Sequence, residues 1–401
     1  MMAVTAMSAA VATEASAQQL VLNNQLQLGD VISGQTLNVE GATDQVSVSN
    51  AATGNSLSGS TVGVSGDLRS VQQMNGNADA STTMTFGGDT SAQVYAVTQA
   101  AGNSTAGGAY GADLAVDSDQ SVDAGEITAS SAIRGGTARL LSGADIGVAA
   151  AGNTMALGGT GTHISGAVHQ TSDASVRASN LVEARYIPAA AIVASEAAGN
   201  DTAISGEAAS SQYIYVGQRS TGDVVSADTS ANAGNAWDLT GSAVANANQA
   251  ILANQGGSVV ARTQQENISE VASSARVTSF DFGAATASAQ GGANVVSVSN
   301  NDQWLEIDNS QINSGGVEVQ AEFVGTNGYD AYVSANAVGN SVTGSACSTC
   351  LAQLGADNVQ RNEGNVSASA STTINAQGRA VVTGANAVGN AATFYVTRPG
   401  Q

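Results

Sequence analysis

The chain contains no lysine. All 11 basic residues are arginine, against 32 Asp and Glu, and the net charge is −21. A phosphate backbone must be met by clustered Lys or Arg, so this balance excludes a nucleic-acid-binding role. It also disfavours simple docking on anionic lipid. Without lysine, neither a phosphate-binding P-loop nor a Ser–Lys catalytic pair can be built.

Charged residues, aromatics and proline are also scarce. Charged residues make up 11% of the chain and aromatic residues 4%, and there are only two prolines. An ordinary domain is ~25% charged, and disordered chains usually carry more proline and more charge. Ala, Gly, Ser, Thr, Val and Asn dominate instead. Small residues in alternation favour a narrow, regular β core.

The first residues have the pattern of an export signal. Residues 4–13 are apolar or small, and Ala-Ser-Ala at 15–17 is a small-x-small cleavage site before Gln18. No basic residue precedes the apolar run, so two alternatives stay open: a start annotated too far downstream, or an Ala-rich tail. No other stretch approaches the ~18 apolar residues of a spanning helix. We predict a signal peptide at residues 1–17 and a mature chain that is soluble or attached to a surface.

A repeat of about 48 residues runs through the rest of the chain. Its marker is Asn in motifs such as "AAGN" and "ANAVGN", and the intervals between copies are 48, 50, 47, 48, 46, 46 and 50 residues. The glycine is lost at the fifth copy, the sixth copy is weak, and Asn235 matches locally but lies off the register. The marked residues are Asn55, Asn103, Asn153, Asn200, Asn248, Asn294, Asn340 and Asn390.

A second marker confirms the period independently. Seventeen residues after the asparagine lies a glutamine, at Gln72, Gln120, Gln170, Gln265 and Gln311. The fourth copy offers Gln218, one residue late, and the seventh offers Gln360, three residues late. Two markers at one offset make chance a poor explanation.

The repeat predicts an all-β fold. Alternation of period two is visible in "QVSVSNAA" and "GVEVQAEF", which is the strand signal. Propeller blades carry aromatic signatures that are absent here, and sandwiches need large core side chains. We predict a parallel β-helix, or β-solenoid, of about seven 48-residue repeats with two rungs each, roughly 65–70 Å long at the usual strand spacing. An N-terminal cap is expected at 18–45, the solenoid at 46–390 and a C-terminal tail at 391–401.

The recurring asparagines and glutamines suggest a role in such a stack. Gly is expected to turn the chain at a tight corner. The amides that follow are expected to bond from rung to rung in ladders, about 4.8 Å apart. The alternative is turn chemistry with no ladder.

Few residues have the arrangement that catalysis or metal binding requires. His163 and His169 are expected on one outer face of a strand, as solvated residues rather than a metal site. Asp117 and Asp119 could bind Ca²⁺, but solvated surface is favoured. Cys347 and Cys350 form "CSTC", which predicts a loop-closing disulfide in an exported protein rather than a redox or zinc site. We therefore predict no catalytic, cofactor-binding or metal-binding residue, no cofactor, and no enzyme activity.

The export signal, the lysine-free acidic β-repeat and the "AAGN" and "ANAVGN" motifs together resemble the holdfast anchor protein HfaD family, an alphaproteobacterial surface anchor. The Asn and Gln repeats also resemble those of curlin-type fibre subunits, whose period is about half as long. The family resemblance implies a protein of the cell surface or outer membrane that holds the adhesive holdfast polysaccharide. It also implies two partners, a curlin-like anchor protein and a secretion-pore lipoprotein, and self-assembly is compatible with it.

A β-helical enzyme acting on polysaccharide is the alternative function, together with a fibre subunit. A patch of Asp, Arg and Tyr on one face would favour the enzyme. Exposed aromatics without a carboxylate cluster would favour sugar contact by stacking alone. The candidates for such stacking are Tyr95, Tyr110, Tyr213, Tyr215 and Tyr332.

Overall fold

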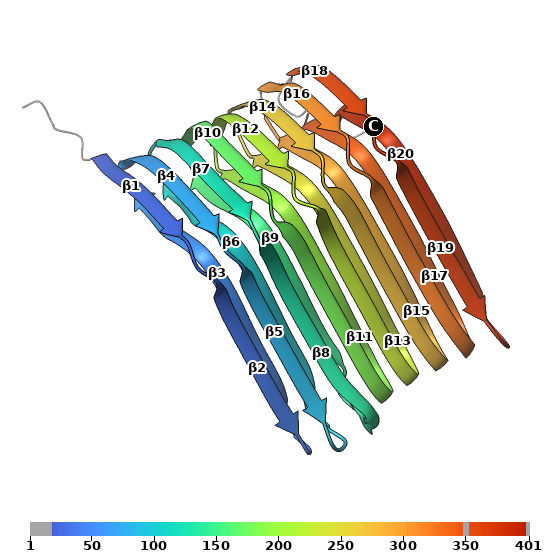
Figure 1. Ribbon diagram of the computed structural model, residues 1–401. Coiled ribbons are helices and arrows are strands. Elements are labelled where there is room, and N and C mark those ends of the chain that lie inside the picture. Colours follow the sequence, from blue (N-terminus) through green and yellow to red (C-terminus); the bar gives the residue numbers. More distant parts are fainter. Residues whose placement is uncertain (1–17, 303, 348–352, 398–401) are drawn as a thin grey trace, which may run out of the picture.

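The computed structural model describes residues 18–302, 304–347 and 353–397. Within these ranges the regular elements are all β-strands, and neighbouring strands pair in parallel in one eight-stranded and one twelve-stranded sheet (Figure 1). Among these residues no helix has the length and apolarity that crossing a membrane requires. The predicted all-β solenoid is confirmed. The predicted signal peptide lies outside the described residues.

Each coil of the solenoid is a flattened loop of two layers. In the first coil, β1 (Gln18–Gln27) and β2 (Val31–Val39) run outward, the chain reverses, and β3 (Gln45–Val62) returns across the core. A short top turn then leads to β4 (Ser65–Asn75), which pairs with β1. We call the row of reversals between outgoing and return strands the U-turn edge.

The later coils repeat this path. Their first outgoing strands are β7 (Leu114–Ala124), β10 (His163–Ser172), β12 (Ser211–Ser220), β14 (Ser258–Asn267), β16 (Trp304–Asn313) and β18 (Gln353–Asn362). The second outgoing strands are β5 (Ala78–Phe86), β8 (Glu126–Arg139) and β19 (Val366–Ile374), and the return strands are β6 (Gln93–Tyr110), β9 (Ala144–Thr160) and β20 (Ala380–Thr397). In four coils one strand continues around the U-turn edge: β11 (Ser175–Glu207), β13 (Val224–Asn254), β15 (Glu270–Asn300) and β17 (Val317–Cys347).

One repeat makes one rung, so the prediction of two rungs per repeat is wrong. Asn55 pairs directly with Asn103, and Gln72 with Gln120, each 48 residues further along the chain. Eight coils at the ~4.8 Å spacing of paired strands give a stack roughly 34 Å long, half the predicted length.

The core between the layers is narrow and built mainly from Ala, Val and Ile. It falls into two apolar clusters. The larger cluster extends toward the U-turn edge and includes Ile127, Ile133 and Phe323. The smaller lies toward the top turns and includes Leu157 and Ile214. Small side chains fit because the two layers lie close together, as the low aromatic content predicted.

The Gly-Asn motif lies within the return strands, so its assignment to a tight corner is wrong. Gly102 and Asn103 sit in the middle of β6, and both are buried. Two consecutive inward residues switch the alternation of the strand, and the pairing register with the neighbouring coils is kept through this point. Glycine is needed there because a Cβ on Gly102 would lie 2.5 Å from a methyl carbon of Val122 and 2.6 Å from the oxygen of Gly152. Left-handed glycines such as Gly63, Gly111 and Gly161 occupy the top turns instead.

Both ends of the described chain are complete coils. Residues 18–39, within the expected N-terminal cap, pair in register with β4 and β5 as part of the first coil. At the other end, β20 continues through Thr397 and pairs with β17, so it includes most of the expected C-terminal tail. The solenoid strands therefore extend beyond the expected limits of 46 and 390.

Candidate functional site

The repeat asparagines form one continuous row along the core. Each Asn Nδ2 donates to the Oδ1 of the asparagine in the following coil, over 2.7–2.9 Å. Six members are fully buried. The row contains Asn55, Asn103, Asn153, Asn200, Asn248, Asn294, Asn340 and Asn390.

The glutamines form a second row on the outgoing strands, and its bonds run in the opposite direction. Each Gln Nε2 donates to the Oε1 of the glutamine in the preceding coil, over 2.7–2.8 Å. The row includes both late matches and one residue that the sequence did not mark, Gln25. Its members are Gln25, Gln72, Gln120, Gln170, Gln218, Gln265, Gln311 and Gln360.

The two rows also connect the two layers. Asn153 donates to the backbone oxygen of Thr171, which follows Gln170. Gln170 in turn donates to the backbone oxygen of Asp201, which follows Asn200. Each amide group is thus used twice, along the stack and across it. Between the end coils these residues are buried and lack the exposure that binding or catalysis requires, so the geometry assigns the rows to the scaffold.

The outer faces carry the charge. Several arginines pair with a carboxylate one coil away: Arg139 Nε lies 2.7 Å from Asp89, and Arg379 Nε lies 2.9 Å from Asp330. The hydrogen bonds donated by these arginines lower the pKa of Asp89 and of Asp330. Because the pairs are exposed, their net contribution to stability is small. Most carboxylates have no arginine to pair with and leave the surface strongly negative.

The residues considered for metal binding lie on this outer surface. His163 and His169 both point outward from β10, and the His169 ring packs against Tyr215 with centroids 5.2 Å apart. Asp117 and Asp119 point outward from β7. Within residues 18–302, 304–347 and 353–397, no three His, Cys, Asp or Glu side chains gather closely enough to hold a metal ion.

Of the two cysteines, the structure describes Cys347. Cys347 is the last residue of β17, while Cys350 lies outside the described residues. Gln360 follows Asn340 by 20 residues rather than 17, yet it pairs in register with Gln311. The disulfide remains a prediction.

The tyrosines expected on the surface are scattered rather than gathered. Tyr110, Tyr213 and Tyr332 are 46%, 46% and 44% exposed, while Tyr95 and Tyr215 are partly covered. Tyr213 packs under the Arg262 guanidinium, 5.7 Å from its ring centroid. These five residues belong to different faces and ends of the coils, so they form no single site.

A hollow that the sequence did not predict lies at the U-turn edge. Its volume is about 520 Å³, and its walls include Trp237, Tyr329, Asn235, Asp281 and Asn327. Trp237 is 61% exposed and Tyr329 52%. Asn235, the copy that fell off the repeat register, belongs to this hollow. One feature of the sequence could have indicated this hollow: Trp237 and Tyr329 are 92 residues apart, which is two coils of 46.

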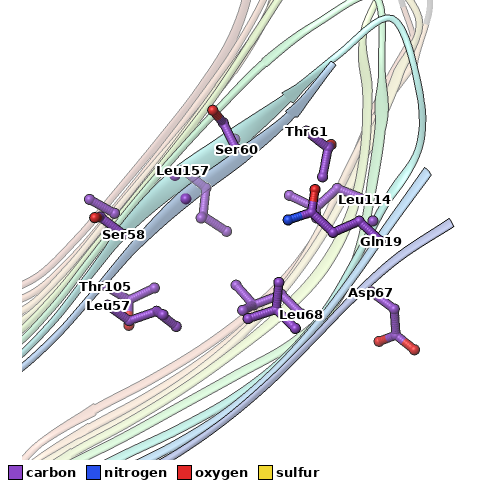
Figure 2. Close-up of a pocket in the computed structure, with 16 residues that line it drawn as sticks. Gln19, Leu57, Ser58, Ser60, Thr61, Asp67, Leu68, Thr105, Leu114 and Leu157 are labelled. Atoms are coloured by element: carbon purple, nitrogen blue, oxygen red, sulfur yellow. The ribbon is translucent and has the colours of Figure 1, made fainter. Parts of the chain in front are cut away.

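A smaller apolar cavity opens between the two layers at the first coils. Leu57, Leu68, Leu114 and Leu157 surround it, and its volume is about 110 Å³ (Figure 2). Gly59 and Gly107, in neighbouring coils of the return layer, provide no side chain to fill it. Leucine side chains and glycines make up much of its wall, beside polar residues such as Gln19, Thr61 and Asp67, and we interpret it as a packing gap of the open first coil.

The whole chain was compared with known proteins. A family model described as holdfast attachment protein D, HfaD, matches residues 40–316, more than half of the chain. No curated protein and no solved structure gives a match. The matched region covers β3 through β16, including most of both amide rows and the Trp237 side of the U-turn edge. The chain therefore belongs to the holdfast attachment protein D family.

Proposed function

We propose that this protein is exported to the cell surface, where it anchors the adhesive holdfast polysaccharide to the outer membrane. The family has a role in holdfast attachment. The observation that carries the anchoring role is the exposed surface of the solenoid, where hydroxyl and amide side chains recur from coil to coil. Ser288 and Ser334, for example, lie in adjacent coils with their hydroxyl oxygens 3.1 Å apart. Asn336 and Asn386 form a similar exposed pair.

Such rows suit a long hydroxylated polymer. Each contact is weak, but a polymer that engages many coils at once gains avidity without any single strong site. A rigid scaffold also limits the entropy that binding costs. The buried amide rows supply that rigidity, because every coil is bonded to its neighbours through side chains as well as backbone.

The same proposal assigns the protein a structural role with no catalysis. Its partners would be a curlin-like anchor protein and a secretion-pore lipoprotein of the same system. Among the described residues, the first and last coils each have a neighbouring coil on one side only, and a related β-repeat protein can dock on the backbone groups of the other side. Self-assembly through the same edges is compatible with this arrangement.

Deletion of the gene tests the proposal. We expect the mutant to make normal amounts of adhesive polysaccharide but to release it into the medium, and a plasmid-borne copy should restore attachment. The measurement is the polysaccharide on washed cells and in the medium, from mutant and wild type. A mutant that stops making the polysaccharide, or that keeps it on the cell, contradicts the anchoring role.

A further inference from the structure

Two hollows at the U-turn edge form one continuous track along the stack. The first, about 520 Å³, reaches from Tyr186 to Gln377. The second, about 440 Å³, begins at Arg139 and shares Tyr186 and Asn235 with the first. Together they extend from the third coil to the eighth. Five coil spacings correspond to roughly 24 Å, a length that suits an extended polymer rather than a small metabolite.

The exposed aromatic side chains along this track are Tyr186, Phe280, Trp237 and Tyr329, and Trp237 and Tyr329 lie in one column. At the reversal of the chain, Trp237 lies opposite Gly283, and Gly283 lies opposite Tyr329 in the next coil. The two aromatics are therefore two coils apart, roughly 9–10 Å. Gly283 places no side chain between the two rings. A Cβ there would lie 2.9 Å from the indole Cε3 of Trp237 and 2.4 Å from its backbone oxygen.

Packing holds these rings and the floor beneath them in place. The Arg379 guanidinium lies 5.3 Å from the Tyr329 ring centroid and is fixed by its ion pair with Asp330. Below the track, Phe282 is buried and meets Phe323 edge to face, with centroids 4.9 Å apart. A prearranged site loses little conformational freedom when its ligand binds.

Polar side chains line the track beside the rings. Asn235, Asp281 and Asn327 are consecutive members of one row across three coils. Asn327 donates to Asp281 over 3.2 Å, and the remaining amide and carboxylate groups stay open to a ligand. Exposed aromatic faces flanked by a few oriented hydrogen-bonding groups are the usual composition of a ligand site.

We propose that this track binds an extended chain of uncharged pyranose sugars. The apolar faces of two sugar rings would stack on Trp237 and Tyr329, and their hydroxyls would bond to the row of Asn235, Asp281 and Asn327. Although Arg139 and Arg185 line one end of the track, the net charge of −21 repels an anionic polymer. The inference rests on the proposed function, and it names the surface through which the polysaccharide is held.

Tryptophan fluorescence gives a direct test, because the chain has only two tryptophans, Trp237 and Trp304. In a Trp304→Phe protein the emission reports on Trp237 alone. Polysaccharide isolated from wild-type cells is expected to shift this emission to shorter wavelength in a saturable manner. Trp237→Ala and Tyr329→Ala are each expected to weaken binding at least about tenfold in a pull-down. Tyr110→Ala, which removes a comparably exposed ring outside the track, is the matched control and should bind like the wild type.

Thermal unfolding of each variant establishes that it is folded before binding is compared. Unchanged Trp237 emission when the polysaccharide binds overturns the proposal, as does wild-type affinity in Trp237→Ala. A shift of the Trp237 emission that a proline-rich peptide causes and the polysaccharide does not also overturns it. Expressed in the deletion strain, a Trp237→Ala protein that reaches the surface should release the adhesive. If it retains the adhesive while the deletion strain sheds it, the track is wrong and the anchoring role stands; a deletion strain that sheds nothing refutes the anchoring role itself.

Discussion

Asn103 and Gln120 lie on opposite layers of the core, and Asn103 donates a 2.7 Å hydrogen bond to the backbone oxygen of the residue that follows Gln120. Gln120 donates to the backbone oxygen of Thr154 over 3.0 Å, the residue that follows Asn153. A one-residue slip of either layer would break both contacts and leave buried amides unpaired. Because such groups are costly to leave unpaired, the two rows fix the register of the coils.

Removing one amide from the asparagine row should destabilise the solenoid. Asn200 accepts from Asn153 and donates to Asn248 and to the backbone oxygen of Arg219. Asn200→Ala leaves these three buried groups without that partner, so we expect the free energy of unfolding to fall by about 3–5 kcal/mol. Denaturant unfolding measures it. Asn336→Ala, an exposed control, should change it by less than about 0.5 kcal/mol, and equal effects of the two substitutions would argue against the row.

Two neighbouring glycines should respond oppositely to alanine. A Cβ on Gly59 meets no atom within 4 Å, whereas one on Gly107 would lie 2.1 Å from the oxygen of Gly59. Gly59→Ala should raise the free energy of unfolding by up to about 1 kcal/mol, because it restricts the unfolded chain. Gly107→Ala should lower it by about 1–3 kcal/mol through forced backbone movement. Thermal unfolding of the two variants checks the order, and the reverse order would contradict the packing of the first coils.

Stability should increase on mild acidification because of Asp201. Burial, together with the charge of Glu196, raises the pKa of Asp201 from 3.8 to about 6, against an opposing hydrogen bond with Gln249. The folded state therefore binds a proton more tightly than the unfolded state. The penalty of the charged carboxylate is present above pH 6 and disappears as the pH falls from about 6 to about 4, a gain of roughly 2–3 kcal/mol.

The control for this pH dependence is Asp201→Asn, which removes the titrating group and keeps its shape. Acidification also relieves repulsion among the other carboxylates, so the difference between the two proteins isolates Asp201. We expect the midpoint of thermal unfolding to rise more steeply in the wild type between pH 7 and pH 4. Parallel profiles would show that Asp201 is not the source.

The two cysteines should be joined in protein taken from the cell surface. The surroundings there are oxidising and the loop between them is short. Labelling with a thiol reagent should modify neither residue before reduction and both afterwards. Two reactive thiols without reductant would refute the prediction.

The 48-residue interval identified the columns of the stack, because residues in one column must make the same contact in every coil. The number of rungs per repeat could not be read from it. The alternation of inward and outward residues is the same whether 48 residues form one rung or two. The distance from Asn103 to Gln120 was the available clue: 17 residues is the path over one top turn, from one layer to the other.

The U-turn track was missed because its residues vary from coil to coil, and the 92-residue spacing from Trp237 to Tyr329 was a weak signal beside the repeat. The column at the reversal reads Trp237, Gly283, Tyr329 and Arg379, four different residue types with four different roles. The pairing register shows that they are neighbours. A repeat search weights identity between coils, so it finds the scaffold and misses a site that depends on differences between them.

Retention of the polymer by the purified protein tests the central claim most directly. The full chain is immobilised on beads, polysaccharide isolated from cells is applied, and the amount and length of the retained polymer are measured after extended washing. The account predicts retention of polymer at its original length, with none on beads that carry an unrelated acidic protein. Failure to retain it, or recovery of shortened chains, would contradict an anchor and favour an enzyme.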